Sequence, residues 1–234
     1  FSESNTEGNN NPLFNIGTKN NGSNGTIDIY IRGAGPTVGH IFSTAEPFDD
    51  EWHHVVFVQN DLERSIYVDG VLDDLEIAPK PESGWDNINA TTIGGILRGN
   101  ASHWVTGVID DVALWKRALS ADEVSELTNS GMPKQGGGEL VPGMIAHWDF
   151  DDVNTIMDTV AGLEGEVMGE VEAAEGKLGG AVDLGEAENW IKVDAEETGW
   201  LAPASDANQM SVSLWQKLNV VRNSSTFWFR AEAA

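Results

Sequence analysis

Apolar residues alternate with polar ones along much of the chain, which is typical of β-strands that bury one face. Ile27, Ile29 and Ile31, for example, are each separated by a single residue of another kind. The same pattern, bounded by turn-forming residues, predicts a short strand within residues 1–26 and further strands at 53–59, 64–68, 91–96, 105–115, 144–150, 165–171, 181–184, 190–194, 210–217 and 226–230. This many short strands predict an all-β protein.

One segment breaks the strand pattern and predicts a helix after residue 120. Ser120 and Glu123 have the spacing of a capping box, in which each side chain bonds the other residue's backbone amide. Val124 and Leu127 supply an apolar face, and Gly131 ends the segment. A single helix among many strands favours an antiparallel β-sandwich.

Five motifs occur in order within residues 51–131. They are Trp-His-His-Val-Val at 52–56, Tyr-Val-Asp-Gly at 67–70, Ile-Gly at 93–94, Gly-Val-Ile-Asp-Asp-Val at 107–112 and Ala-Leu-Ser-Ala-Asp-Glu at 118–123. On these motifs the region resembles the second half of a laminin-G-like, concanavalin-A-like jelly-roll domain. Residues 144–217 are similar to the first half of such a domain, in the Ala-His-Trp-Asp-Phe-Asp segment at 146–151, in the Gly-Lys-Leu-Gly-Gly-Ala-Val segment at 176–182 and in Ser-Val-Ser-Leu-Trp at 211–215.

The resemblance places the two halves of one domain in permuted order. Residues 1–131 correspond to the C-terminal half, residues 132–143 form a glycine-rich linker, and residues 144–234 correspond to the N-terminal half. A linker of this length reaches up to roughly 40 Å when extended. The second half can therefore complete the sandwich of its own chain or that of a neighbouring copy. Exchange between copies would build an open head-to-tail filament. Because the chain starts at Phe1 without a signal peptide, we expect a processed or excerpted polypeptide.

Charge limits the partners of the chain. The net charge is -25, from 38 acidic and 13 basic residues, and it should repel nucleic acid and anionic lipid. No apolar run is long enough to insert into a membrane. The chain has no cysteine, which excludes disulfides and thiolate metal sites. Divalent cations and basic partners should be attracted, although a solvated acidic surface is the simpler interpretation.

A group of aspartates gives a candidate metal site. Asp110 and Asp111 lie in one predicted strand, and Asp151 and Asp152 follow the strand expected beside it, with Asp158 in the next loop. Calcium prefers several carboxylate and carbonyl oxygens, which adjacent strand ends can supply. The family resemblance also implies calcium there. The alternative is that these carboxylates cap turns and face water.

Four tryptophans near predicted turns are candidates for ligand or interface contacts. They are Trp85, Trp104, Trp190 and Trp200. An exposed ring there could stack on a sugar or serve a protein interface, whereas ordinary packing is the competing interpretation.

The sequence favours a protein that is not an enzyme. His53 and His54 are adjacent and should point to opposite faces of a strand, so they cannot share a metal. No Gly-x-Ser-x-Gly nucleophile motif occurs. Our main hypothesis is a secreted structural module of an extracellular filament or repeat array, with other copies of the chain as partners. The alternative is a carbohydrate-binding or adhesive module of a cell-surface protein, with glycans as ligands.

Overall fold

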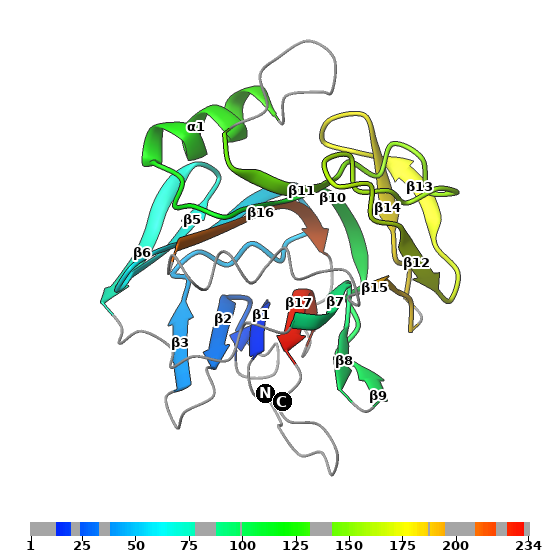
Figure 1. Ribbon diagram of the computed structural model, residues 1–234, viewed down its shortest axis with the longest axis horizontal. Coiled ribbons are helices and arrows are strands. Elements are labelled where there is room, and N and C mark those ends of the chain that lie inside the picture. Colours follow the sequence, from blue (N-terminus) through cyan, green and yellow to red (C-terminus); the bar gives the residue numbers. More distant parts are fainter. Residues whose placement is uncertain are drawn as a thin grey trace.

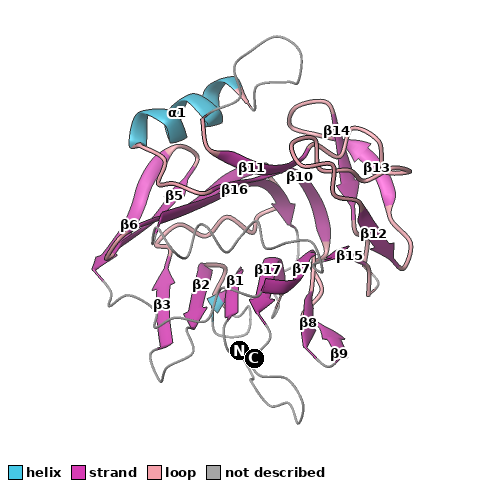
Figure 2. Ribbon diagram, viewed as in Figure 1, coloured by secondary structure: helices cyan, strands magenta, loops and turns pink. Residues whose placement is uncertain are grey.

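The computed structural model describes residues 13–19, 24–32, 38–77, 88–98, 100–131, 142–186, 188–194, 209–218 and 224–231. Antiparallel strands dominate these residues, as Figure 2 shows. They form two facing sheets with a core between them (Figure 1). The predicted fold class, an all-β antiparallel jelly-roll sandwich of the concanavalin A and laminin-G type with one short helix, is confirmed.

The first sheet has seven strands. Their order across the sheet is β12 (Gly165–Met168), β15 (Trp190–Asp194), β7 (Ile88–Ile93), β17 (Ser225–Ala231), β1 (Leu13–Thr18), β2 (Ile27–Arg32) and β3 (Val38–Phe42). A separate two-stranded hairpin is formed by β8 (Ile96–Arg98) and β9 (Asn100–Ser102).

The second sheet has eight strands. Seven of them follow the order β13 (Glu172–Glu175), β14 (Gly180–Asp183), β10 (Gly107–Trp115), β16 (Gln209–Leu218), β4 (His53–Asn60), β5 (Glu63–Val68) and β6 (Val71–Ile77). The eighth, β11 (Met144–Trp148), pairs with β10.

The strands of the two sequence portions interleave within one polypeptide. In the second sheet β16 lies between β4 and β10, and in the first sheet β17 lies between β1 and β7. Strand β11 runs antiparallel to β10, with Val112 opposite Trp148. Most of the predicted linker, residues 132–141, lies outside the described residues. Where the chain resumes, the Gly143 carbonyl accepts a hydrogen bond from the Lys116 amide.

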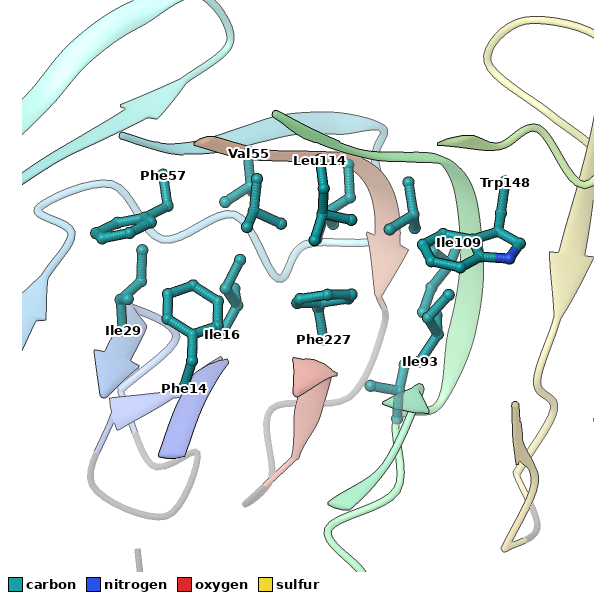
Figure 3. Close-up of a cluster of buried hydrophobic side chains, with 14 of the residues drawn as sticks. Phe14, Ile16, Ile29, Val55, Phe57, Ile93, Ile109, Leu114, Trp148 and Phe227 are labelled. Atoms are coloured by element: carbon teal, nitrogen blue, oxygen red, sulfur yellow. The ribbon is translucent and has the colours of Figure 1, made fainter. Parts of the chain in front are cut away.

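Alternation along the strands directs apolar side chains into the space between the sheets. Phe14 from one sheet meets Phe57 from the other, and Phe227, a neighbour of Phe14 in the first sheet, lies farther along the same core, as Figure 3 shows. Ile109 and Trp148 extend this core toward the end of the sandwich where β10 and β11 pair. One continuous core therefore draws on both sequence portions.

Helix α1 (Ala121–Ser130) covers the outer face of the second sheet. The Ser120 side chain accepts from the Glu123 amide and the Glu123 side chain bonds the Ser120 amide, as the capping box predicts. Val124 and Leu127 are buried against Val56 and other outward side chains of the sheet. No helix among the described residues is long and apolar enough to span a membrane.

Candidate functional site

Two consecutive carboxylates, Asp110 and Asp111, are buried in the middle of β10. Their exposed fractions are 0% and 3%. In a regular strand they would point to opposite faces. Here the pairing with β16 shifts register between Asp110 and Ala113, and Asp111 has a φ of 47°, in the left-handed region. A β-bulge of this kind re-aims side chains, and it allows both carboxylates to be buried.

The two carboxylates face different neighbours. Asp110 Oδ2 accepts a hydrogen bond of 3.2 Å from the Leu178 amide, in the turn that follows β13. Asp111 Oδ1 lies 2.8 Å from His147 Nε2 on β11, and the other nitrogen of that ring lies 3.1 Å from Thr159 Oγ1. The carboxylate pair therefore connects β10 both to β11 and to the turn at 176–180.

One oxygen of each carboxylate lacks a partner. Among the described residues, Asp110 Oδ1 and Asp111 Oδ2 are buried and receive no hydrogen bond. A buried, unsatisfied carboxylate oxygen is costly, because it has lost water and gained nothing in return. Such atoms indicate either that a proton is bound or that a ligand supplies the missing contact.

Electrostatics at the site disfavour two negative charges. Burial, together with repulsion from Asp111, raises the pKa of Asp110 to about 7, and the hydrogen bond from Leu178 opposes this only in part. Burial also raises the pKa of Asp111, against the hydrogen bond from His147, and the nearby Asp149 and Asp151 add to the rise. The site would gain from a cation.

The turn at 176–180 packs closely against Asp110. A Cβ placed on Gly176 would lie 2.6 Å from Asp110 Oδ2 and would also clash with the Gly180 carbonyl. Only glycine allows the backbone to approach the carboxylate this closely. The Gly180 amide in turn donates a hydrogen bond of 2.6 Å to Asp151 Oδ1. Asp151 and Asp110 therefore contact the same turn, and Asp151 does so at the more exposed rim of the site.

The other two predicted metal ligands hold turns of the backbone. Asp158 is 1% exposed and accepts from the amides of His147, Val160 and Ala161 at 2.7, 3.0 and 2.7 Å. Asp152 is exposed and accepts from the backbone and side chain of Asn154. Of the five predicted aspartates, Asp110 and Asp111 are therefore buried next to each other, Asp151 contacts the turn at 176–180 from the exposed side, and Asp152 and Asp158 lie in turns of their own.

The described residues offer oxygen donors of the kind that calcium prefers, but few side chains to supply them. Within those residues no three His, Asp or Glu side chains form a ready-made metal cluster. The two unsatisfied oxygens of Asp110 and Asp111 are the hard donors that calcium prefers, and its remaining ligands would come from backbone carbonyls and water. The sequence did not single out His147 or the turn at 176–180, although both lie in the motifs that carry the family resemblance.

Two of the four predicted tryptophans lie together. Trp104 is half-buried and Trp190 is 6% exposed, and both border Gly95, whose added Cβ would lie 3.3 Å from an atom of each residue. Packing therefore accounts for Trp190. Trp85 and Trp200 lie outside the described residues.

The histidines of β4 point to opposite faces, as alternation predicts. His53 is bonded on both ring nitrogens, to Asp69 at 2.8 Å and to Asp49 at 3.0 Å, and its pKa is raised by these hydrogen bonds against the effect of burial. The ring of His54 is fully buried between Thr128 Oγ1 at 2.6 Å and Ser213 Oγ at 2.7 Å, and burial lowers its pKa to about 4. Ser213 is also 0% exposed, so this Ser–His pair cannot meet a substrate.

Comparisons with known proteins agree with this fold. The sequence model of the concanavalin A-like lectin/glucanases superfamily matches residues 1–125, which confirms the resemblance inferred from the motifs of that region. The human adhesion G-protein coupled receptor D1 is 28% identical over 105 residues, which are 44% of this chain. The matched region is 12% of the receptor, so the chain spans only a small part of that relative.

Proposed function

Because the chain belongs to the concanavalin A-like lectin/glucanase superfamily, we propose that it is a non-enzymatic, extracellular binding module of the adhesive kind, with calcium held at Asp110 and Asp111. The observation that carries the proposal is the pair of buried carboxylate oxygens without hydrogen-bond partners. The name of the human relative, an adhesion receptor, supports the adhesive and extracellular part.

A role without catalysis is supported by the burial of two histidines, His54 and His147. The His54–Ser213 pair is fully buried, and the His147 ring is turned toward Asp111 with an exposed fraction of 5%. General base and nucleophilic catalysis both require a side chain within reach of a substrate. These histidines instead hold strands and the helix together.

Calcium would supply positive charge where burial and mutual repulsion disfavour the carboxylates. Asp110 and Asp111 would hold it, and Asp151, at the exposed rim, accepts a hydrogen bond from the same turn at 176–180 that contacts Asp110. Binding there would stiffen the junction of β10, β11 and the turn at 176–180. A rigid rim of loops is a suitable surface for a ligand.

Calorimetry and thermal unfolding of the full chain test the calcium part. We expect calcium chloride to bind and to raise the melting temperature of protein freed of calcium by a chelator, because a ligand of the folded state alone stabilises it. Asp110→Asn should abolish both effects. The matched control is Asp152→Asn, which removes an exposed charge nearby and should leave both intact. No calcium effect, or equal loss in both variants, would remove calcium from the proposal.

Binding assays test the adhesive part separately. We expect the full chain to bind at least one ligand on a glycan array or on a panel of extracellular matrix proteins. Each panel is probed with and without calcium, to show whether binding depends on the calcium site. Absence of binding to both panels would contradict the adhesive role even if calcium binds. Glycans are the ligand class that the family resemblance suggests. The described tryptophan Trp190 adds no support for them, because its ring is buried.

Assembly by exchange of halves is a second and more specific candidate. The observation that favours it is the interleaving of β16 and β17 among strands of the first portion, because every such pairing could form equally between two copies. Size-exclusion chromatography over a range of concentrations tests it. Head-to-tail filaments predict a ladder of oligomers that grows with concentration, and a folded monomer at all concentrations would contradict exchange.

A further inference from the structure

Exposed apolar side chains gather on the hairpin of β5 and β6. Among the described residues six large hydrophobic side chains are exposed, and four of these lie on β6: Val71, Leu72, Leu75 and Ile77. A fifth, Leu62, lies in the turn before β5. Val71 and Ile77 are 68% and 63% exposed. A concentration of this kind marks a surface that meets a partner more often than scattered exposed residues do.

Strand β6 is also the end of its sheet. It pairs with β5 on one side and has no strand of the described chain on the other, and it lies at the left edge of the upper sheet in Figure 1. Asp73 anchors its middle by accepting hydrogen bonds from the Thr44 and Ala45 amides. Farther along, the Leu75 amide donates a hydrogen bond of 2.9 Å to the side chain of Asp74. An added strand could take over this donor.

The charges of the hairpin determine which strand could be added. Its exposed and half-buried charged residues are all acidic: Asp61, Glu63, Asp69, Asp73, Asp74 and Glu76. Its one basic residue, Arg64, is 2% exposed. A second copy of the chain could pair its own β6 antiparallel to this one, about a two-fold axis. In the registers with the greatest overlap, an acidic residue then lies opposite another acidic residue; with Asp74 at the centre, for example, the two copies of Asp74 lie opposite each other. Like charges directly opposite one another destabilise a strand pair. The same carboxylates attract a basic strand.

We propose that β6 is a docking edge for an extended, positively charged segment of a partner protein, in which apolar residues alternate with lysine or arginine. The segment would pair its backbone with residues 74–77, pack its apolar side chains against Leu75 and Ile77 and place its basic side chains near Asp74, since Glu76 already lies opposite the buried Arg64. The other edge of the same sheet, β13, carries Glu172 and Glu175 around two alanines. That edge has acidic residues without the exposed large apolar ones, so it serves as the matched control. The surface is separate from Asp110 and acts whether or not calcium binds.

The test uses the full chain and a synthetic peptide of alternating lysine and valine, about eight residues long. The same peptide with a central proline is the control, because proline removes a backbone donor and cannot continue a strand pairing. We expect the first peptide to slow hydrogen exchange of the β6 amides and the proline peptide to bind at least about fivefold more weakly.

Two variants separate docking at β6 from general attraction to an acidic protein. Ile77→Lys should weaken binding of the lysine–valine peptide about tenfold, because it replaces an apolar contact by a repelling charge. Ala173→Lys on β13 adds the same charge at an exposed position of the opposite edge and should change binding less than about twofold. Equal effects of the two variants, equal binding of the proline peptide, or protection elsewhere than in β6 would overturn the proposal.

Discussion

Asp158 and Asp110 are both withdrawn from solvent, with exposed fractions of 1% and 0%, and they differ in the donors that surround them. Asp158 closes its turn by accepting from three backbone amides, two on one oxygen and one on the other. Asp110 Oδ2 accepts a hydrogen bond from Leu178, while its Oδ1 has no partner among the described residues and a second carboxylate, Asp111, lies next to it.

The difference teaches that burial alone does not mark a functional carboxylate. A buried carboxylate with its full set of amide donors is a structural element, since the backbone has already compensated for the lost water. A buried carboxylate with an unsatisfied oxygen and a like-charged neighbour lowers the stability of the fold, so the remaining contacts must compensate for it. Such costs persist at sites where a ligand or a proton completes the arrangement.

The largest effect should come from removing the satisfied carboxylate. Asp158→Ala leaves three amides, one buried and two partly buried, without their charged acceptor and should lower the free energy of unfolding by about 4 kcal/mol. Chemical denaturation measures the change. Asp158→Asn keeps one acceptor oxygen and should cost about half as much. If Asp158→Ala costs less than about 1 kcal/mol, the turn does not depend on this carboxylate and the contrast with Asp110 fails.

Asp110, the carboxylate with an unsatisfied oxygen, should have a smaller effect on the free energy of unfolding, and this effect should depend on pH. The pKa of Asp110 is raised from 3.8 to about 7, so between these values the folded protein binds a proton that the unfolded chain releases. Without calcium, this group therefore makes stability fall as the pH rises from about 4 to about 7. The loss is on the order of 3 kcal/mol, once some relaxation around the buried charge is allowed for.

Asp110→Asn isolates this contribution. The amide cannot ionise, so the variant should lose the fall in stability between pH 4 and 7 and should be more stable than the natural chain at pH 8 without calcium. Denaturation at a series of pH values, with chelator present, measures both. An unchanged pH profile in Asp110→Asn would mean that another group titrates and that Asp110 is as well compensated as Asp158.

The sequence predicts the fold far better than it predicts this contrast. Periodicity locates the strands that bury one face, such as β2 and β4, and the capping box locates α1. Strands β3, β6, β9 and β13 are missed, and the strand predicted at 91–96 reaches only the first residue of β8. Val-Leu-Asp-Asp-Leu-Glu-Ile in β6 has no regular alternation because a bulge interrupts its register and its side chains are largely exposed, while β13 has no large apolar residue. Edge strands bury too little to leave a clear period.

The carboxylates show a similar limit. Sequence proximity groups Asp110 with Asp111, and the family motif places β11 beside them, as the pairing of Val112 with Trp148 bears out. Composition cannot say which of the aspartates receives backbone amides. That depends on a bulge at Asp111, a turn at 157–163 and the close approach of Gly176, all of which are set by tertiary packing.

The smallest effect should come from replacing Asp152, which lies in the same acidic segment as Asp158 but is exposed to solvent. Within the part of the chain that the structure describes, its side chain accepts hydrogen bonds from Asn154 alone, in an exposed turn, and those hydrogen bonds lower its pKa. Asp152→Ala should leave the denaturation midpoint unchanged within experimental error at neutral pH, because water replaces the lost contacts. Denaturation beside Asp158→Ala measures it under the same conditions. A loss as large as that of Asp158→Ala would show that position in the acidic segment matters more than burial and amide donors, and the comparison would then have to be abandoned.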